Sequence, residues 1–512
     1  MRLVSERFNA STILDRNLEA GRGDKVAIRW GGEALTYSQV LDRACRFGRA
    51  LRDLGVQPEQ RVLLVLDDSP AFPIAFLGAI RAGIVPVPLT PLANADELGF
   101  FLEDSYARAV IVDAGNLDKV RGEATHARRP VVLVAAGAPA EGAHGLDELL
   151  EAADPALPTA DTHSDDMAFW LYSSGSTGRP KGVVHLQRDI PYTCERYAGP
   201  ILGITAGDVT FSSTKLYHAY GLGNALSFPF WAGATTVLMP GRPSPEAVLD
   251  VVERERPTLF FSVPTLYNAM LNSPGAEGRD LSSVRLCVSA AEALPPGVWR
   301  RWMDAYGLTI LDGVGSTEML HIYCSNTPRE MRPGSSGKPV PGYDLALEDF
   351  DGNPVGAGEP GNLLVRGGSA LAYYWHRHEQ TKRCLRGEWF FTGDRYRKDA
   401  DGFFWYEGRS DDMMKVGGLW VSPIAIENTI GEHPDVAEVA VVTVKRDELP
   451  RIKAFVVCKN DRKGDDAFAD ELRAWCKGRL QRYQYPHLVE FPDELPKTQT
   501  GKIQRYKLRD QG

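Results

Sequence analysis

Along the N-terminal part of the chain, apolar positions follow two different spacings. Residues 36–54 carry apolar side chains at helical spacing behind a capping box of Thr36 and Gln39, which predicts an amphipathic helix. The unbroken apolar run 62–66 that follows is typical of a buried strand. The same alternation predicts a helix from about residue 70, a strand at 84–88, a helix near 95–104 and a strand at 109–112. Strands and helices in turn indicate a parallel sheet covered on both faces, the α/β fold class.

A second alternation follows in the middle of the chain. Ser244 and Pro245 predict the start of a helix that reaches about Arg256. Strands are predicted at 259–263, 284–288 and 308–311, and a helix at 297–306. Two of these strands lead into segments of small and polar residues, 289–294 and 312–318, which we expect to be loops. Open α/β sheets bind ligands at such strand ends.

The pattern of predicted elements changes after about residue 335. Short strands between Gly and Pro residues, at 362–366, 389–392 and 403–406, indicate a β-rich subdomain. The tail predicts helices at 423–430 and 467–479 and strands at 436–444 and 452–457, enough for a small α+β domain. We therefore expect a large N-terminal domain of layered α/β subdomains plus the β-rich subdomain, residues 1–410, and a small mobile C-terminal domain, residues 411–512. The Ala-, Gly- and Pro-rich stretch 134–160 predicts a surface loop.

Charge and composition narrow the function. The 512 residues carry a formal net charge of −9, which argues against a nucleic-acid binder. The seven cysteines are scattered without a C-x-x-C pair, as expected for a reducing cytoplasm and not for a zinc site. No signal peptide is evident, and the most apolar long stretch, 72–89, is interrupted by prolines and an arginine, so no membrane span is expected. These features indicate a cytoplasmic enzyme.

A run of small polar residues follows the apolar strand segment 168–172. Glycines let successive N–H groups point into one concavity, and hydroxyls add donors, so the run predicts an anion-binding loop. Lys181 adds a full positive charge. The spacing is not that of a Walker A loop, because Pro180 precedes and Gly182 follows the lysine, and a flexible linker is the alternative. The run consists of Ser173, Ser174, Gly175, Ser176, Thr177 and Gly178.

Glu318 ends the other small-residue segment and is a candidate metal ligand. Mg²⁺ prefers oxygen and is usually bound through one or two carboxylates together with phosphates. On the residues alone, a solvated surface glutamate is the alternative.

Residues 170–185 closely resemble the signature of the adenylate-forming enzymes, which include acyl-CoA synthetases, adenylation domains of peptide synthetases and beetle luciferases. The resemblance spans almost the entire chain, with further motifs in family order at 290–293, 315–318, 391–394, 408–412 and 495–503. It implies ATP, Mg²⁺ and CoA as the small molecules that the enzyme uses. No nucleophilic cysteine or Ser–His–Asp set is required, because the substrate itself becomes an activated anhydride.

The resemblance implies roles for individual residues. Thr317 would contact phosphate and Glu318 the metal, Asp394 would accept hydrogen bonds from both ribose hydroxyls, and Arg409 would contact ribose and phosphate. Lys502 would stabilise the carboxylate and α-phosphate, which makes Lys502, Thr317 and Glu318 the implied catalytic residues. Without the resemblance, Asp394 would be a turn cap, Arg409 a surface ion pair and Lys502 part of a basic tail.

The remaining implied nucleotide contacts come from the same motifs, although the family more often has Gly where Ala291 stands. In the C-terminal domain, Asp411 would be the hinge, and Gly418 and Trp420 would line the tunnel for the pantetheine thiol. The implied nucleotide and CoA set is Ser173, Ser174, Gly175, Ser176, Thr177, Gly178, Lys181, Ala290, Ala291, Glu292, Asp312, Gly313, Val314, Gly315, Ser316, Thr317, Asp394, Arg409, Gly418, Trp420 and Lys502.

Three segments, 217–224, 315–321 and 337–343, look most like those of benzoate-CoA ligases. Small residues beside an aromatic one predict a flat slot for one ring. We therefore expect benzoate or a simple substituted benzoate, with 2-aminobenzoate a serious candidate, whose substituent His218 and His321 would accommodate; His218 packing beside the pocket is the alternative. The expected acid-binding set is His218, Ala219, Tyr220, Gly221, Ala290, Gly313, Gly315, Leu320 and His321.

Other functions stay open at this stage. The thiol could belong to a carrier protein instead of CoA, and the chain could be a non-catalytic nucleotide sensor, although it keeps both Glu318 and Lys502. Nothing in the sequence favours a luciferase-like oxygenase. We expect a monomer or a homodimer that binds neither nucleic acid nor membrane.

Overall fold

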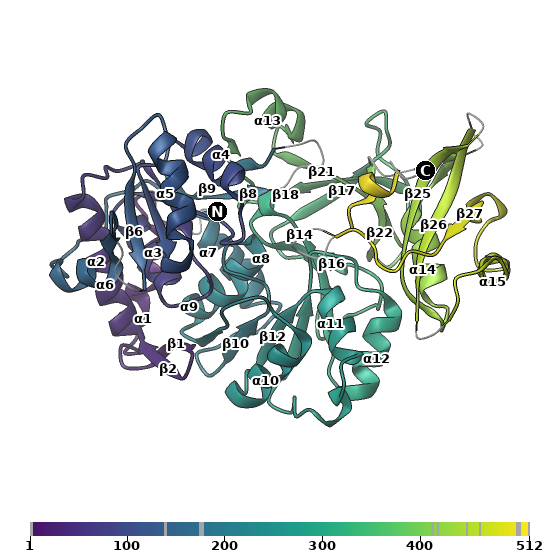
Figure 1. Cartoon of the computed structure of the whole chain (residues 1–512), viewed down its shortest axis with the longest axis horizontal. Coiled ribbons are helices and arrows are strands. Elements are labelled where there is room, and N and C mark those ends of the chain that lie inside the picture. The colour runs from purple at the N-terminus through teal and green to yellow at the C-terminus, as the bar shows by residue number, and fades with distance from the viewer. Residues whose placement is uncertain are drawn as a thin grey trace.

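The computed structural model describes residues 4–137, 141–173, 179–410, 414–416, 419–446, 449–459, 462–497 and 503–509. The molecule is elongated, with the N-terminal layers at one end and the C-terminal strands and helices at the other (Figure 1). None of the helices within these ranges combines the length and the hydropathy that a bilayer crossing requires.

The first layer is a five-stranded sheet in the order β4-β3-β5-β6-β7, paired in parallel throughout. Alternate residues of each strand face opposite sides, so Val62 and Leu64 pack with α2 and α3, whereas Leu63 and Val65 pack with α4 and α5. The α/β class is thereby confirmed. Its strands are β3 (Arg61–Val65), β4 (Val85–Pro88), β5 (Ala109–Asp113), β6 (Val132–Ala136) and β7 (His144–Gly145). Its helices are α2 (Tyr37–Asp53), α3 (Ala71–Arg81), α4 (Ala95–Ser105), α5 (Leu117–His126) and α6 (Leu146–Ala152).

Two details of this layer test the sequence patterns. The capping box of Thr36 and Gln39 at the start of α2 is present, as predicted. The expectation of a surface loop over 134–160 is wrong, because β6, β7 and α6 lie there. Leu146 and Leu150 bury the inner face of α6 in the core. Their helical spacing is the signal that the Ala- and Gly-rich composition obscured.

The second layer is a nine-stranded sheet in the order β16-β15-β14-β13-β12-β10-β11-β1-β2. Helices α10, α11 and α12 cover one face, where Tyr267 and Trp302 are fully buried. Its strands are β1 (Val26–Trp30), β2 (Glu33–Thr36), β10 (Val209–Ser212), β11 (Thr235–Leu238), β12 (Leu259–Ser262), β13 (Leu286–Ser289), β14 (Ile310–Gly315), β15 (Ile322–Ser325) and β16 (Lys338–Pro339). The helices are α10 (Pro245–Glu255), which Ser244 caps as predicted, α11 (Pro264–Leu271) and α12 (Pro296–Tyr306).

One expected loop in this sheet is a strand. Residues 312–315 continue β14, because the antiparallel partner β15 pairs Gly313 with Ser325 and Gly315 with Ile322. Only from Ser316 does the chain leave the sheet, to form the short 3₁₀ helix η6 (Thr317–Met319). The glycines made the segment look irregular, whereas they allow a close approach of the neighbouring strand.

A small three-stranded sheet, β19-β9-β8, joins distant parts of the chain. The hairpin of β8 (Met167–Ser173) and β9 (Lys181–Leu186) is completed by β19 (Tyr373–Tyr374), which pairs with β9. The β-rich region expected after residue 335 forms a sheet of β17 (Asp344–Glu348), β18 (Pro360–Arg366), β20 (Leu385–Arg386), β21 (Trp389–Lys398) and β22 (Phe404–Arg409), next to α13 (His378–Cys384).

Short helical pieces complete the N-terminal part. Two of them, η3 and η4, are π-helical turns that continue the α-helices before them. They are α1 (Asp15–Glu19), α7 (Asp189–Thr193), η3 (Cys194–Ala198), α8 (Ala219–Leu222), η4 (Gly223–Ser227) and α9 (Phe228–Ala232), together with the 3₁₀ turns η1 (Ala10–Ile13), η2 (Ala114–Asn116) and η5 (Ala276–Gly278).

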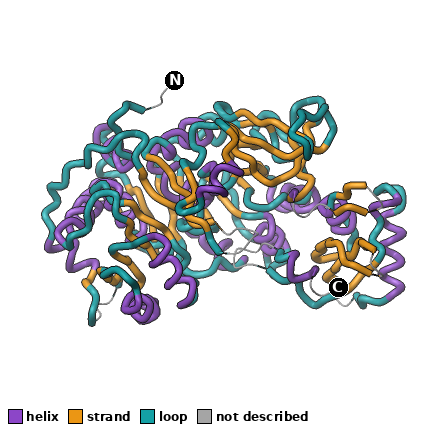
Figure 2. Tube along the Cα trace, turned by 90° about the horizontal axis from the view of Figure 1, so that it is seen from above, coloured by secondary structure: helices purple, strands orange, loops and turns teal. Residues whose placement is uncertain are grey.

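The C-terminal strands and helices gather at one end of the molecule (Figure 2). Their apolar side chains form two clusters made only of residues from 414 onward. The predicted helix over 467–479 ends earlier, at Cys476. The elements are β23 (Met414–Val416), β24 (Leu419–Val421), α14 (Pro423–Gly431), β25 (Val436–Arg446), β26 (Leu449–Cys458), α15 (Asp466–Cys476), η8 (Arg482–Gln484), β27 (Leu488–Glu490) and α16 (Arg505–Arg509).

Candidate active site

The hairpin β8–β9 carries the segment predicted to bind phosphate. Ser173, the last residue of β8, pairs with Lys181, the first residue of β9, so the two strands fix both ends of the intervening loop. The candidate residues Ser174, Gly175, Ser176, Thr177 and Gly178 lie outside the described residues.

Glu318 lies in η6 beside the base of this loop and is half-buried. Its Oε1 atom accepts hydrogen bonds from the hydroxyls of Ser173 (3.3 Å) and Tyr374 (2.9 Å). Its Oε2 atom has no hydrogen-bond partner among the described residues. The carboxylate therefore keeps an oxygen available to a ligand such as Mg²⁺.

The described residues do not supply a complete metal site. Within these ranges, no cluster of three or more His, Cys, Asp or Glu side chains could hold a metal ion. A single carboxylate next to a phosphate-binding hairpin fits Mg²⁺, which takes most of its ligands from phosphate and water.

A buried pair, His185 and Asp189, connects the hairpin with η6. His185 Nε2 lies 2.8 Å from the carbonyl oxygen of Thr317, and its Nδ1 lies 2.9 Å from Asp189 Oδ2. Both side chains are fully buried, and the imidazole stacks on Phe169 with ring centroids 5.2 Å apart. The backbone of Thr317, next to Glu318, is thus held by the strand that begins at Lys181.

The predicted adenine segment follows the end of β13. Ala290 is buried, whereas Ala291 is exposed and has a left-handed backbone with φ +74°. Glycine adopts this conformation without strain, which gives a physical reason for the glycine more often found there in the family. Glu292 Oε2 accepts hydrogen bonds from the backbone N–H (3.2 Å) and the hydroxyl (2.7 Å) of Thr265.

Asp394 and Arg409, the candidate ribose contacts, face each other across β21 and β22. Arg409 Nη1 lies 3.0 Å from Asp394 Oδ1 and also donates to the carbonyl oxygen of Thr392. Burial, and next the charge of Asp394, raise the pKa of the Tyr323 hydroxyl well above its ordinary value. The arrangement brings together an aspartate, an arginine and a neutral phenol.

The acid-binding candidates gather around α8 and the turn after η6. His218 precedes α8, Ala219 is nearly buried, and Tyr220 donates from its hydroxyl to the carbonyl oxygen of Val288 (3.1 Å). The Tyr220 ring lies 5.5 Å from the ring of His321. Leu320, with φ +66°, turns the chain between η6 and β15.

His321 is only 3% exposed and lies among aromatic rings. Its ring centroid is 4.4 Å from that of Phe228 and 5.5 Å from that of Tyr197. Its Nε2 atom lies 3.2 Å from Asn224 Oδ1. Burial lowers the pKa of His321 to about 3, so the imidazole is neutral at physiological pH.

The glycines of the acid-binding set have a packing reason for being small. A methyl group on Gly221 would lie 2.1 Å from the carbonyl oxygen of Lys215, and one on Gly315 would lie 2.5 Å from that of His321. A methyl group on Gly313 would lie 2.9 Å from the carbonyl oxygen of Cys324. A Cβ atom at each of these positions would therefore meet neighbouring backbone. That Gly313 and Gly315 also leave space for the substrate ring stays a prediction.

Three further residues of the implied nucleotide-binding set, Asp312, Val314 and Ser316, lie at the end of β14 or directly after it. Burial raises the pKa of Asp312 well above its ordinary value, which favours the neutral acid. Val314 is half-buried, and the Ser316 hydroxyl caps η6 by accepting from Met319 N–H (3.2 Å). In the C-terminal part, Trp420 pairs with Lys415 in the β23–β24 hairpin. The candidates Asp411, Gly418 and Lys502 lie outside the described residues.

Sequence reasoning assigned no role to His185, Asp189 or Tyr374. His185 is the last residue of the signature segment, and that position is the only feature of the sequence that could have marked it as a functional residue. Tyr374 lies within an aromatic run, Tyr373-Tyr374-Trp375, that is indistinguishable from core packing in the sequence. His185 lies 132 positions from its partner Thr317, and Tyr374 lies 56 positions from its partner Glu318, so no local spacing reveals these contacts.

The comparisons with known proteins agree with this geometry. Residues 14–375 match the AMP-binding enzyme family, and residues 425–502 match the AMP-binding enzyme C-terminal domain. A benzoate–CoA ligase of Thauera aromatica is 45% identical over 510 residues, which span 99% of this chain and 96% of the relative. A crystal structure of the anthranilate CoA ligase AuaEII in complex with anthranoyl-AMP superimposes with a TM-score of 0.95 at 40% identity, covering 99% of this chain and 98% of that one. A benzoate CoA ligase from Burkholderia xenovorans LB400 gives a TM-score of 0.92 at 43% identity, covering 98% of this chain and 100% of that one.

Proposed function

The chain belongs to the AMP-binding enzyme family, the AMP-forming acid–thiol ligases that use ATP, Mg²⁺ and CoA, and we propose that its acid is benzoate or a simple substituted benzoate, with 2-aminobenzoate foremost among the substituted acids. Two aspects support the aryl acid: the relatives named as benzoate and anthranilate CoA ligases, and the aromatic surroundings of the acid-binding candidates.

The observation that carries the choice of acid is the group of Tyr220, His321 and Asn224. Flat rings favour an aromatic acid over an aliphatic chain. His321 Nε2 and Asn224 Oδ1 contact each other, whereas His321 Nδ1 and Asn224 Nδ2 are buried without a hydrogen-bond partner among the described residues. A substrate that carries one hydrogen-bonding substituent would satisfy them, which favours 2-aminobenzoate over unsubstituted benzoate.

The reaction has two steps. A carboxylate oxygen of the acid bonds to the α-phosphorus of ATP while the bond to pyrophosphate breaks, which gives an aryl-AMP. The CoA sulfur then loses its proton and bonds to the carbonyl carbon, and AMP leaves. Because the acid and the α-phosphate are both anions, neutralising charge is the main task of the site in the first step.

Each charged residue has a place in this proposal. Lys181 and the loop 174–178 hold the β- and γ-phosphates, Glu318 binds Mg²⁺, and Asp394 and Arg409 hold the ribose. Mg²⁺, when bound, would offset part of the phosphate charge. Lys502, on the C-terminal domain, supplies the cation at the reacting carboxylate. Glu318 is half-buried beside the phosphate hairpin, and its Oε2 atom has no hydrogen-bond partner in the part of the chain that the structure describes, which supports these roles.

We extend the proposal to a mobile C-terminal domain, residues 411–512, that turns about Asp411 between the two steps. In the second step Gly418 and Trp420 would line the pantetheine tunnel, since glycine leaves room for a thin chain. The separate apolar clusters of this part support independent movement. A cytoplasmic location and a monomeric or homodimeric state complete the proposal; the seven free cysteines support the reducing compartment.

The choice of acid is tested by pyrophosphate release. The enzyme is incubated with ATP and Mg²⁺ and with benzoate, each aminobenzoate, each hydroxybenzoate and matched aliphatic acids. Release is expected with benzoate and 2-aminobenzoate at the highest kcat/KM. Activity confined to aliphatic acids would contradict the proposal.

The thiol is tested separately, because a carrier protein is the second candidate. The purified aryl-AMP complex is offered free CoA in one reaction and a pantetheinylated carrier protein in another. Thioester formation with CoA is expected, as in the named relatives. Exclusive transfer to the carrier protein would instead identify a stand-alone loading enzyme.

The role of Lys502 is tested by Lys502→Ala, which should lower aryl-AMP formation by at least about 100-fold, because it removes a charge that acts on the reacting groups. Lys497→Ala is the matched control from the same segment. Lys497 pairs with Glu438 (2.6 Å) and should be dispensable. Equal rates for the two variants would refute the role of Lys502.

A further inference from the structure

Tyr374 is a buried residue of β19 that lies between the two proposed phosphate-site charges. Its backbone pairs with Val183 of β9, and its N–H donates to the Thr381 hydroxyl (3.0 Å). That hydroxyl in turn donates to the carbonyl oxygen of Arg377 (3.0 Å). The tyrosine is therefore held from both sides, by the phosphate hairpin and by the start of α13.

The side chain makes one contact with each charge. Its hydroxyl donates to Glu318 Oε1 over 2.9 Å. Its ring faces Lys181, whose Nζ lies 4.8 Å from the ring centroid. A cation near an aromatic face and a carboxylate at a phenol are both favourable, so one side chain satisfies a lysine and a glutamate at once.

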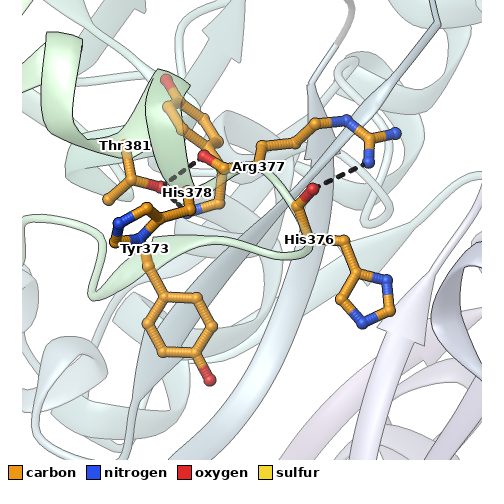
Figure 3. Close-up of a pocket in the computed structure, with 6 residues that line it drawn as sticks. Tyr373, His376, Arg377, His378 and Thr381 are labelled. Carbon is orange, nitrogen blue, oxygen red and sulfur yellow. Dashed lines mark hydrogen bonds between the residues drawn. The ribbon is translucent and has the colours of Figure 1, made fainter.

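The other described donor to Glu318 Oε1 is the Ser173 hydroxyl, at the longer distance of 3.3 Å. Tyr374 also lines an open cavity of about 400 Å³ together with five neighbours (Figure 3). The cation of that cavity, Arg377, is engaged elsewhere: its Nη2 lies 3.4 Å from Asp104 Oδ1, and its Nη1 donates to the carbonyl oxygen of His376. The other cavity-lining residues are Tyr373, His376, His378 and Thr381.

We propose that Tyr374 is a positioning residue that fixes the carboxylate of Glu318 through Oε1, leaving Oε2 for the metal–triphosphate, and holds the Lys181 ammonium next to it. This inference depends on the metal-binding role proposed for Glu318. A carboxylate that is free to rotate would lose this alignment. We therefore expect Mg²⁺ to bind more weakly while the binding of the acid stays unchanged.

The test is Tyr374→Phe, which removes only the hydroxyl and keeps the ring over Lys181 and the apolar packing. Tyr373→Phe is the matched control, because Tyr373 is 37% exposed and its hydroxyl contacts only the sulfur of Met167 among the described residues. Mg²⁺-dependent ATP binding is measured by calorimetric titration, and ATP–pyrophosphate exchange is measured against free Mg²⁺ at saturating acid. The half-saturating Mg²⁺ concentration should rise about tenfold for Tyr374→Phe, the effect of one hydrogen bond to a charged group. It should not change for Tyr373→Phe.

The KM for the acid separates a positioning role from a general structural one. It should stay within about twofold of wild type in Tyr374→Phe, because the hydroxyl contacts Glu318 and not the acid-binding residues. A parallel rise in the KM for the acid and in the Mg²⁺ requirement would overturn the inference.

A double-variant cycle with Glu318→Gln completes the test. If Tyr374 acts through Glu318, adding Tyr374→Phe to Glu318→Gln should have little further effect on exchange. Fully additive losses would overturn the inference. If Glu318→Gln is impaired and Tyr374→Phe behaves like the control, the inference fails and the proposed function stands. If Glu318→Gln itself keeps the wild-type Mg²⁺ dependence, the proposed role of Glu318 fails.

Discussion

Ala291 has a backbone conformation that its own methyl group disfavours. With φ +74°, an alanine costs about 1 kcal/mol relative to a residue without a Cβ atom. A glycine removes this strain and loses about 0.5–1 kcal/mol through the greater freedom of the unfolded chain. We therefore predict that Ala291→Gly leaves the free energy of unfolding unchanged or slightly higher in urea titrations.

The neighbouring Ala290 provides the control. It is 2% exposed and its φ is not positive, so glycine gains nothing there. Ala290→Gly should lower the free energy of unfolding by about 1 kcal/mol, from the lost methyl packing and the added chain entropy. Equal losses for the two variants would show that Ala291 is not strained.

His321 makes the fold sensitive to acid. Because burial lowers its pKa to about 3, the folded protein keeps it neutral, whereas the unfolded chain takes up a proton below about pH 6.5. Its contribution to stability is complete above pH 6.5 and falls by about 1.4 kcal/mol for each unit below that value. The prediction is that His321→Gln flattens the dependence of the unfolding free energy on pH between 7 and 5.

The exposed His144 is the comparison for this experiment, since His144→Gln removes a histidine without touching the core. Its pH dependence should match the wild type. An unchanged slope in His321→Gln would mean that the buried imidazole titrates normally in the folded protein.

At the scale of elements, β9 connects the phosphate hairpin to η6 through His185 and Asp189. His185→Phe keeps the stack on Phe169 and removes both hydrogen bonds of the imidazole. Of the described donors, the buried Asp189 carboxylate then keeps only the Leu186 N–H, and the Thr317 carbonyl keeps only the Leu320 N–H. We expect a loss of about 2–4 kcal/mol in unfolding free energy and a lower rate of pyrophosphate exchange.

Asp189→Asn and the double variant show whether the two residues act together. Their combined effect should fall short of the sum of the single effects by about 1–3 kcal/mol. Strict additivity in unfolding titrations would show that His185 and Asp189 stabilise the fold independently.

The elements differ in how well the sequence predicts them. Periodicity and caps predicted α2 and α10 within a residue or two, because Thr36, Gln39 and Ser244 act on their own first turns. The end of β14 was missed because β15, which comes later in the chain, decides whether residues 312–315 are extended. Composition hid α6 for a different reason, since short helices leave few periodic positions.

Residues of the candidate site also differ in whether the sequence alone points to them. Motif residues such as Glu318, Asp394 and Arg409 can be proposed from the sequence because the family signature is local. Tyr374 and His185 were missed because their partners are distant in sequence and adjacent only in the fold. The sequence predicts substrate space at Gly315 but does not reveal that a methyl group there would lie 2.5 Å from the carbonyl oxygen of His321, because strand pairing sets that contact.

At the scale of the whole molecule, the C-terminal part has its own apolar clusters. If it turns about Asp411 between the two steps, Asp411→Pro should restrict that turn, because proline fixes φ near −65°. We predict that this variant forms aryl-AMP at close to the wild-type rate and loses at least about tenfold in thioester formation.

Rapid-quench measurements of both steps give the outcome. Pyrophosphate release with each acid reports the first step, and aryl-CoA appearance after CoA addition reports the second. Similar losses in both would show that residue 411 is not a hinge, and no loss in either would show that the turn does not pass through it.

The pairing of β9 with β19 also bears on how the protein is made. The β8–β9 hairpin gains its third strand only from Tyr373 and Tyr374, so a nascent chain on the ribosome cannot assemble this part of the nucleotide site until that strand has emerged. Abandoned translation products that stop short of it would therefore lack Tyr374 next to Glu318, and we expect them to leave the cellular ATP pool untouched.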